Sequence, residues 1–343
     1  MTKYYPALHS LRGFAAIWVY LLHIWFYSGQ PDLFFTPFLS LGWVGVHLFY
    51  ILSSFLLGTI YFSHQQSEKW SLATFYKKRF LRIFPAYYVQ LIIMLTIAYF
   101  GYLHFPEIKS LIAHLFMYFH LPPYNIQPLN GVWWTLPIEF GFYLILPLLV
   151  LVLRKVGPLL FILLSLLITY SYRYWVYQTL EDESIGLMAN TIGQLPGVLI
   201  IFSLGLTCAY ILHNHKSTHK NNNYVAILAL IGTTLWSSVL FSNKDFYWSG
   251  SLLLYFWESI NTFFLVLFVA YFYQSRNKFL THKVFVFLGK ISYGVYLWHL
   301  PIILLMKDYV HDFYQLLMVT APLTLTLASL SYYYVERKFS KSL

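Results

Sequence analysis

An arginine and a histidine lie eleven residues apart in the first long apolar segment, YYPALHSLRGFAAIWVYLLH. The Arg12 guanidinium can bind an anion, and the His23 imidazole can take the proton of a hydroxyl group or carry an acyl group. In a helix, eleven residues rise by about 16 Å and return to within about 20° of the same face. The two side chains are therefore expected to form one stripe that suits a long anionic ligand. In the alternative interpretation, Arg12 reaches the lipid surface and His23 bonds to a neighbouring helix.

Two further arginines lie three residues apart in TFYKKRFLRIFPAYY, so Arg79 and Arg82 share one helix face. Guanidinium groups bind phosphates through two parallel hydrogen bonds, which makes this pair a candidate clamp for a phosphorylated cofactor. The alternative is a basic cluster that contacts lipid head groups, which is the favoured interpretation for the adjacent Lys77 and Lys78.

A carboxylate, Glu139, lies within the apolar sequence GVWWTLPIEFGFYLILP. An acid in such a segment needs a partner, and beside a histidine it would hold the imidazole in one tautomer and stabilise its positive charge. A structural hydrogen bond to a neighbouring helix is the alternative. We therefore take Glu139, with His23 and Arg12, as the candidate catalytic set.

The other ionisable groups in apolar segments are individually less specific. They are His47, Glu258 and His299, with Arg173 and Lys290 nearer the segment ends. Packing is the favoured interpretation for His47, Glu258 and His299. The histidines lack metal-binding spacing such as H-E-x-x-H, and Cys208 is the single cysteine, so no metal site is predicted.

The composition identifies the solvent in which these residues must be positioned. Of 343 residues, 59% are hydrophobic and 10% are charged, whereas an ordinary soluble domain has about 25% charged residues. Such a chain cannot cover a water-facing surface, which excludes a soluble, disordered or disulfide-rich protein. Apolar runs that could cross a bilayer lie at about 7–28, 38–62, 83–103, 132–153, 157–177, 192–212, 224–241, 250–273, 284–305 and 313–334.

The distribution of basic residues predicts the topology. If the N-terminus is cytoplasmic and the short stretch 109–121 does not span, the outside loops contain only Lys109, Lys244 and Lys307 among the lysines and arginines. The cytoplasmic loops then carry the basic excess, as expected. We predict an all-α polytopic membrane protein with about ten transmembrane helices and both termini cytoplasmic. The net charge of +10 is then mostly a topology signal and does not indicate a nucleic-acid partner.

The same segments, taken in order, resemble the acyltransferase-3 family of membrane O-acyltransferases. The resemblance extends over essentially the whole chain and rests on YYPALHSLRGFAAIWVYLLH, GWVGVHLFYILSSFL, FYKKRFLRIFPAYY, VWWTLPIEFGFYLILPLL, ISYGVYLWHLPII and SLSYYYVERKF. It implies a single membrane-embedded acyltransferase domain over 1–343, without a hydrolase-like extension after Phe339. Two positions depart from the family pattern: His47 replaces an Asp, and Phe140 replaces a second Glu.

The resemblance also implies an activity. The expected enzyme, in the bacterial inner membrane, transfers an acyl group, usually acetyl from acetyl-CoA, to a hydroxyl of a cell-envelope glycan such as O-antigen or exopolysaccharide. Its partners would be acyl-CoA, a glycan or lipid-linked glycan acceptor and membrane lipids. The family's functional residues correspond to Arg12, His23, Arg79, Arg82 and Glu139.

Residues and resemblance together suggest one mechanism with two variants. The arginines Arg79, Arg82 and Arg12 would hold the phosphates of CoA, while His23 acts either as general base or as a covalent acyl carrier. A succinyl donor is also compatible with the sequence. A transporter or flippase of a lipid-linked glycan is the competing function, because buried ionisable groups suit it as well.

Overall fold

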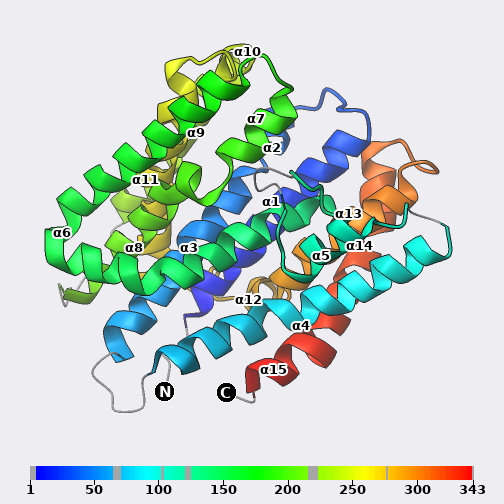
Figure 1. The fold of residues 1–343 in the computed structure, drawn as a ribbon, viewed down its shortest axis with the longest axis horizontal. Coiled ribbons are helices and arrows are strands. Elements are labelled where there is room, and N and C mark those ends of the chain that lie inside the picture. The colour runs from blue at the N-terminus through cyan, green and yellow to red at the C-terminus, as the bar shows by residue number, and fades with distance from the viewer. Residues whose placement is uncertain are drawn as a thin grey trace. The chain divides into compact units, whose positions relative to one another are not determined.

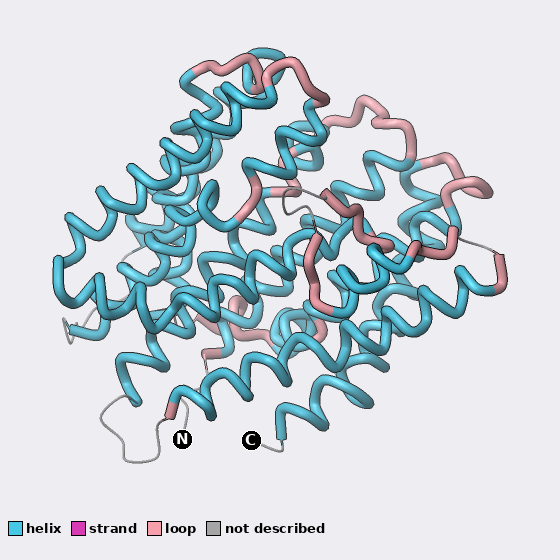
Figure 2. Tube along the Cα trace, viewed as in Figure 1, coloured by secondary structure: helices cyan, strands magenta, loops and turns pink. Residues whose placement is uncertain are grey.

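All regular secondary structure in the described part of the chain is helical (Figure 2). The computed structural model describes residues 5–64, 71–101, 104–119, 125–214, 223–275 and 277–341. The longer helices are α1 (Pro6–Tyr27), α3 (Val44–His64), α4 (Leu72–Tyr99), α6 (Thr135–Leu180), α8 (Leu199–Asn214), α9 (Asn223–Ser242), α11 (Leu252–Gln274), α13 (Ser292–Met306) and α14 (Phe313–Ser331). The shorter ones are α2 (Thr36–Ser40), α5 (Ile108–Leu115), η1 (Gly131–Trp134), α7 (Ile185–Ile192), η2 (Leu195–Val198), α10 (Lys244–Tyr247), α12 (Lys283–Lys290), the π-helical η3 (Tyr332–Glu336) and α15 (Arg337–Lys341).

Eight helices of the described residues are long and apolar enough to cross a bilayer, and nine if the bent pair of α12 and α13 is one span. This confirms the predicted all-α polytopic membrane protein. One of the eight covers 50 residues, Gly131–Leu180, which at about 1.5 Å per residue is about 75 Å, far more than one bilayer core of about 30 Å. Gly157 interrupts it with φ 81° and ψ 166°, a conformation open to glycine, and Pro158 follows. The two parts correspond to the separately predicted spans 132–153 and 157–177.

Three other predicted spans have different boundaries. The span expected at 83–103 is α4, which begins at Leu72 because Ser71 caps its N-terminus by accepting a hydrogen bond from the Thr74 amide. The span expected at 284–305 is broken into α12 and α13, which meet at an angle of 68°. The span expected at 38–62 is divided between the short helix α2 and the long helix α3. At the intervening Gly42, any Cβ atom would collide with the Trp18 carbonyl oxygen.

The described part of the segment expected not to span, 109–121, overlaps one helix, the eight-residue α5 (Ile108–Leu115). Eight helical residues rise by about 12 Å, too little to cross a bilayer. The predicted orientation, with both termini cytoplasmic, stays a prediction.

The chain divides into two compact units, each built from separate segments. The first unit comprises Met1–Ala15, Trp43–Glu68 and Leu144–Gly289, and the second comprises Ala16–Gly42, Lys69–Tyr143 and Lys290–Leu343. In the first unit α3 packs along α8. Small residues allow this close approach, since a Cβ atom on Gly205 would collide with Ser54.

In the second unit α13 and α14 lie side by side (Figure 1). Gly294 permits their contact, because a Cβ atom there would lie 2.8 Å from the Ala328 backbone. The helix α4 contacts α13, η3 and α15 within the same unit. These contacts bring α4, from the first third of the chain, against helices near the C-terminal end.

Candidate functional site

Two histidines from distant parts of the sequence meet in the second unit. The Nδ1 atom of His23 on α1 lies 3.2 Å from the Nε2 atom of His299 on α13, and the two ring centroids are 5.0 Å apart. His299 is completely buried, whereas His23 is partly exposed. His23 was a predicted catalytic residue. For His299, packing was the favoured interpretation, and the sequence did not indicate its contact with His23.

Both imidazoles are also anchored to their own helices. Nδ1 of His23 is 2.9 Å from the carbonyl oxygen of Val19, and Nδ1 of His299 is 2.9 Å from that of Val295. Each carbonyl belongs to the residue four positions earlier in the same helix. The rings therefore have defined orientations, which a catalytic imidazole requires.

Two tyrosine rings enclose His299. Tyr20 meets it edge to face with ring centroids 6.0 Å apart, and Tyr296 lies at 5.9 Å. The Tyr20 hydroxyl is 2.6 Å from the Thr320 hydroxyl, and the Tyr296 hydroxyl donates to the Val132 carbonyl at 2.8 Å. Residues from α1, α13, α14 and η1 thus hold one imidazole in place.

Pro301 allows other elements to be fastened to α13 near His299. Proline has no N–H group, so the Leu297 carbonyl four residues earlier lacks its helical partner. The side-chain amides of Gln90 and Asn130 donate to this oxygen at 2.7 and 2.9 Å. The Trp133 indole N–H in turn donates to the side-chain oxygen of Gln90 at 2.7 Å. The result is a buried amide network that joins α4 and η1 to α13.

The predicted phosphate-binding arginines lie on α4 in the same unit, and both face acidic or aromatic partners. Arg82 Nη1 is 3.6 Å from Glu336 Oε2, and the Arg82 guanidinium lies 6.0 Å from the centre of the Tyr293 ring. Arg79 interacts electrostatically with Tyr143 and Glu139. Glu336 belongs to the π-helical η3, a type of distortion that often marks functional sites.

Glu139 lies at the beginning of α6 in this cluster. Its carboxylate accepts a hydrogen bond from the Tyr143 hydroxyl one turn later, and its charge acts on Tyr293 and Tyr296 of α13. No hydrogen bond joins Glu139 to His23 in the part of the chain that the structure describes. The predicted partnership with His23 is therefore not a direct hydrogen bond. Glu139 acts on Tyr296, the Tyr296 ring lies beside His299, and His299 contacts His23.

A stripe of side chains on α13 connects the arginines of α4 with the histidine pair. Tyr293, Tyr296 and His299 recur at intervals of three residues, so they follow one side of the helix, and six residues correspond to about 9 Å. Tyr293 contacts the arginine cluster and donates to the Ile83 carbonyl at 2.9 Å, while His299 contacts His23. The spacing in ISYGVYLWHLP was the sequence signal for this stripe.

Arg12 lies on α1 and belongs to the first unit, where its side chain is half-buried and has interaction partners. Because α1 is one continuous helix, the expected rise of about 16 Å between Arg12 and His23 holds.

A second set of buried charges lies in the first unit. Arg173 is completely buried and forms an ion pair with Glu258, and it donates to the carbonyl oxygens of Gly197 and Leu254 at 2.8 and 2.6 Å. Glu258 also lies 3.9 Å from His47 Nε2. These contacts satisfy the arginine and favour a packing role for Glu258 and His47.

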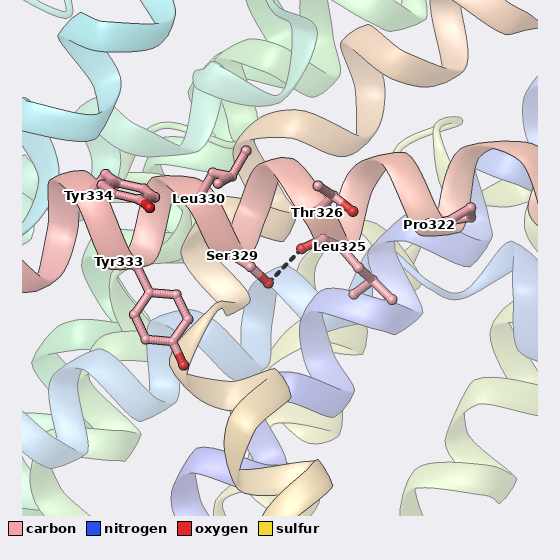
Figure 3. A pocket seen from close by; sticks show the side chains of 7 residues that line it. All are labelled: Pro322, Leu325, Thr326, Ser329, Leu330, Tyr333 and Tyr334. Carbon is pink, nitrogen blue, oxygen red and sulfur yellow. Dashed lines mark hydrogen bonds between the residues drawn. The ribbon is translucent and has the colours of Figure 1, made fainter.

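The surface of α14 has an open hollow of about 520 Å³ (Figure 3). It is lined by residues of α14 and η3 alone, from Pro322 to Tyr334, and none of them is a histidine, acid, lysine or arginine. The Ser329 hydroxyl donates a hydrogen bond to the Leu325 carbonyl oxygen. The polar side-chain groups of the hollow are therefore hydroxyls alone, from Thr326, Ser329, Tyr333 and Tyr334. In the described residues no three His, Cys, Asp or Glu side chains are grouped so as to hold a metal ion.

Comparison with known proteins adds to this geometry. The sequence model of a family described as an acyltransferase domain, Acyl_transf_3, matches residues 5–334. The chain is 29% identical to ORF330 of Acidianus two-tailed virus, a candidate acetyltransferase, over 87% of this chain and 83% of that protein. It is 26% identical to the O-acetyltransferase OatA of Staphylococcus aureus and 25% identical to the peptidoglycan O-acetyltransferase OatA of Listeria monocytogenes. Each alignment covers 99% of this chain but only 58% and 56% of the respective relative. No solved structure matches the chain.

Proposed function

The chain belongs to the acyltransferase-3 family, and from that membership we propose that it transfers an acetyl group from acetyl-CoA to a hydroxyl of a cell-envelope glycan. Two of its relatives carry O-acetyltransferase in their names, and one of these names specifies peptidoglycan. The apolar helices suit a location in the bacterial inner membrane. We take peptidoglycan or another envelope polysaccharide, such as O-antigen or exopolysaccharide, as the acceptor class.

The observation that carries this proposal is the position of His23. Its imidazole is anchored by Val19 and His299, lies within a membrane-spanning helix and keeps part of its surface exposed. Such a group can take the proton of the acceptor hydroxyl as general base. The oxygen then forms a bond to the thioester carbonyl carbon, the carbon–sulfur bond breaks, and the proton passes from His23 to the CoA thiolate.

The arginines are suited to hold the donor. CoA carries phosphates, which guanidinium groups bind through paired hydrogen bonds. Arg82 retains 27% of its side-chain surface although Glu336 neutralises it, so its remaining donors can meet a phosphate. We assign Arg79 and Arg82 to donor binding, and we propose the same role for Arg12.

Glu139 is assigned an electrostatic part in the same reaction. Its negative charge acts on Tyr296, whose ring lies beside His299. A carboxylate in this position favours positive charge on the histidine pair when His23 becomes protonated.

Incubation of the purified protein with acetyl-labelled acetyl-CoA and fragments of envelope glycan tests the proposal. We expect alkali-labile label on the sugar, and succinyl-CoA in a parallel reaction reports donor choice. Label that never reaches a sugar would contradict the proposal. Unmodified lipid-linked glycan carried across proteoliposomes would instead indicate the transporter or flippase.

A further inference from the structure

The hydrogen bonds of the two histidines determine where their protons lie. A carbonyl oxygen can only accept a hydrogen bond, so an imidazole nitrogen bonded to one must carry a proton. Nδ1 of His23 faces the Val19 oxygen, and Nδ1 of His299 faces the Val295 oxygen, each at 2.9 Å. Both neutral rings therefore carry their proton on Nδ1.

This arrangement leaves a lone pair on each Nε2 atom. The lone pair of His299 Nε2 lies 3.2 Å from His23 Nδ1, so the His23 Nδ1–H group is shared between two acceptors, the Val19 carbonyl and His299. Shared hydrogen bonds of this kind are common in proteins. The opposite direction, donation from His299 Nε2, would leave the Val295 oxygen facing a bare nitrogen.

The two rings differ in their access to a substrate. His299 is completely buried and uses both nitrogens, whereas His23 is partly exposed and its Nε2 has no hydrogen-bond partner among the described residues. A substrate can therefore contact His23, whose Nε2 is not engaged by the described residues, but not the completely buried His299.

We propose that His299 is a positioning residue for His23: its Nε2 lone pair accepts the His23 Nδ1–H bond and leaves His23 Nε2 as the reacting atom. This inference rests on the proposed acyl transfer. When Nε2 of His23 takes the hydroxyl proton, positive charge develops on the ring and the Nδ1–H bond to His299 strengthens. In a Ser–His–Asp triad a carboxylate provides this support, and here a neutral imidazole provides it without a second buried charge.

The surroundings of His299 are consistent with a fixed acceptor. Tyr20 and Tyr296 contact its ring from two sides. The neighbouring Leu297 carbonyl is tied to Gln90 and Asn130. The backbone that presents His299 is thus held by α4 and η1 as well as by its own helix.

Two substitutions separate an acceptor role from packing. His299→Phe fills the space without an acceptor, whereas His299→Gln can present its side-chain oxygen to His23. We expect His299→Phe to lower kcat by about 100-fold, the scale of a lost acid–base contribution, with KM for acetyl-CoA nearly unchanged. His299→Gln should recover at least about 10-fold of this loss. Wild-type kcat in His299→Phe, or equal loss in both variants, would overturn the proposal.

A control and an independent measurement complete the test. His114→Gln also removes a fully buried histidine with hydrogen bonds at both ring nitrogens, and it should alter stability more than kcat. Nitrogen-15 NMR of the wild-type protein with labelled histidine should show protons on Nδ1 of both His23 and His299. A proton on Nε2 of neutral His299 would overturn the proposal. This spectrum decides the matter even if no acyl-CoA is a donor, an outcome that would refute the proposed function alone.

Discussion

Pro301 leaves the Leu297 carbonyl oxygen of α13 without its helical hydrogen bond, a vacancy that side chains from other elements fill. Pro301 cannot donate to Leu297, and Gln90 and Asn130 donate instead at 2.7 and 2.9 Å. The vacancy lies two residues before His299. The backbone that carries one histidine of the pair is thereby fastened to α4 and to the residue that caps η1.

Replacing Gln90 should loosen this attachment. Gln90→Leu removes one of the two amides that donate to the Leu297 carbonyl and the acceptor of the Trp133 N–H group. The Trp133 N–H group is then buried without a partner, at a cost of about 1–3 kcal/mol. We expect a lower melting temperature in detergent and a lower kcat. Gln315→Leu is the matched control, because Gln315 is exposed on α14. Equal melting temperatures for the two variants would show that the amide network contributes no stability.

Arg82 should affect donor binding more than the reaction of the bound complex. Arg82→Ala removes the guanidinium that faces Glu336 and Tyr293, and we expect a loss of about 10-fold or more in CoA affinity, the scale of a charged hydrogen bond of about 1.5–3 kcal/mol. Calorimetric titration with CoA measures it. Lys77→Ala on the same helix serves as control, since Lys77 is exposed. An unchanged CoA affinity would contradict a donor-binding role for Arg82.

The ion pair of the first unit should govern stability. Glu258→Gln leaves the completely buried Arg173 without its counter-charge, and breaking a buried pair in this way costs about 3–5 kcal/mol. We expect a fall in thermal stability measured by dye-free scanning fluorimetry, with acyl transfer per folded molecule retained. A stable protein that has lost transfer would place Glu258 in the reaction instead.

His114, on the non-spanning α5, should make the stability of the folded protein depend on pH. The Leu129 amide donates to its Nε2 at 2.9 Å, which requires an unprotonated nitrogen, and burial lowers the pKa of His114 below its ordinary value of 6.5. The unfolded chain then binds the proton more readily, so this contribution is complete above pH 6.5 and is lost as the pH falls towards the lowered pKa.

The matching measurement is the difference in melting temperature between pH 7.5 and pH 5.5. His114→Gln should show a smaller difference than the wild-type protein, because it lacks the titrating group. The same difference in both would exclude His114 as its source.

The sequence predicted where helices lie better than it predicted which residues from distant helices contact one another. The first apolar run placed Arg12 and His23 on one helix, and both lie on α1. Apolar length predicted the spans but missed the break between α12 and α13 and the early start of α4, because the bend and the cap depend on local geometry. No pattern within one segment could place His299, 276 residues further on, beside His23.

The histidine at position 23 is the centre of the account, and its removal tests it most directly. In steady-state assays with labelled acetyl-CoA and envelope glycan, His23→Ala should reduce kcat by at least about 100-fold while the protein still inserts into the membrane. His311→Ala, which removes an exposed histidine outside the site, should retain wild-type activity. Near-wild-type acetylation by a correctly inserted His23→Ala protein would contradict the account.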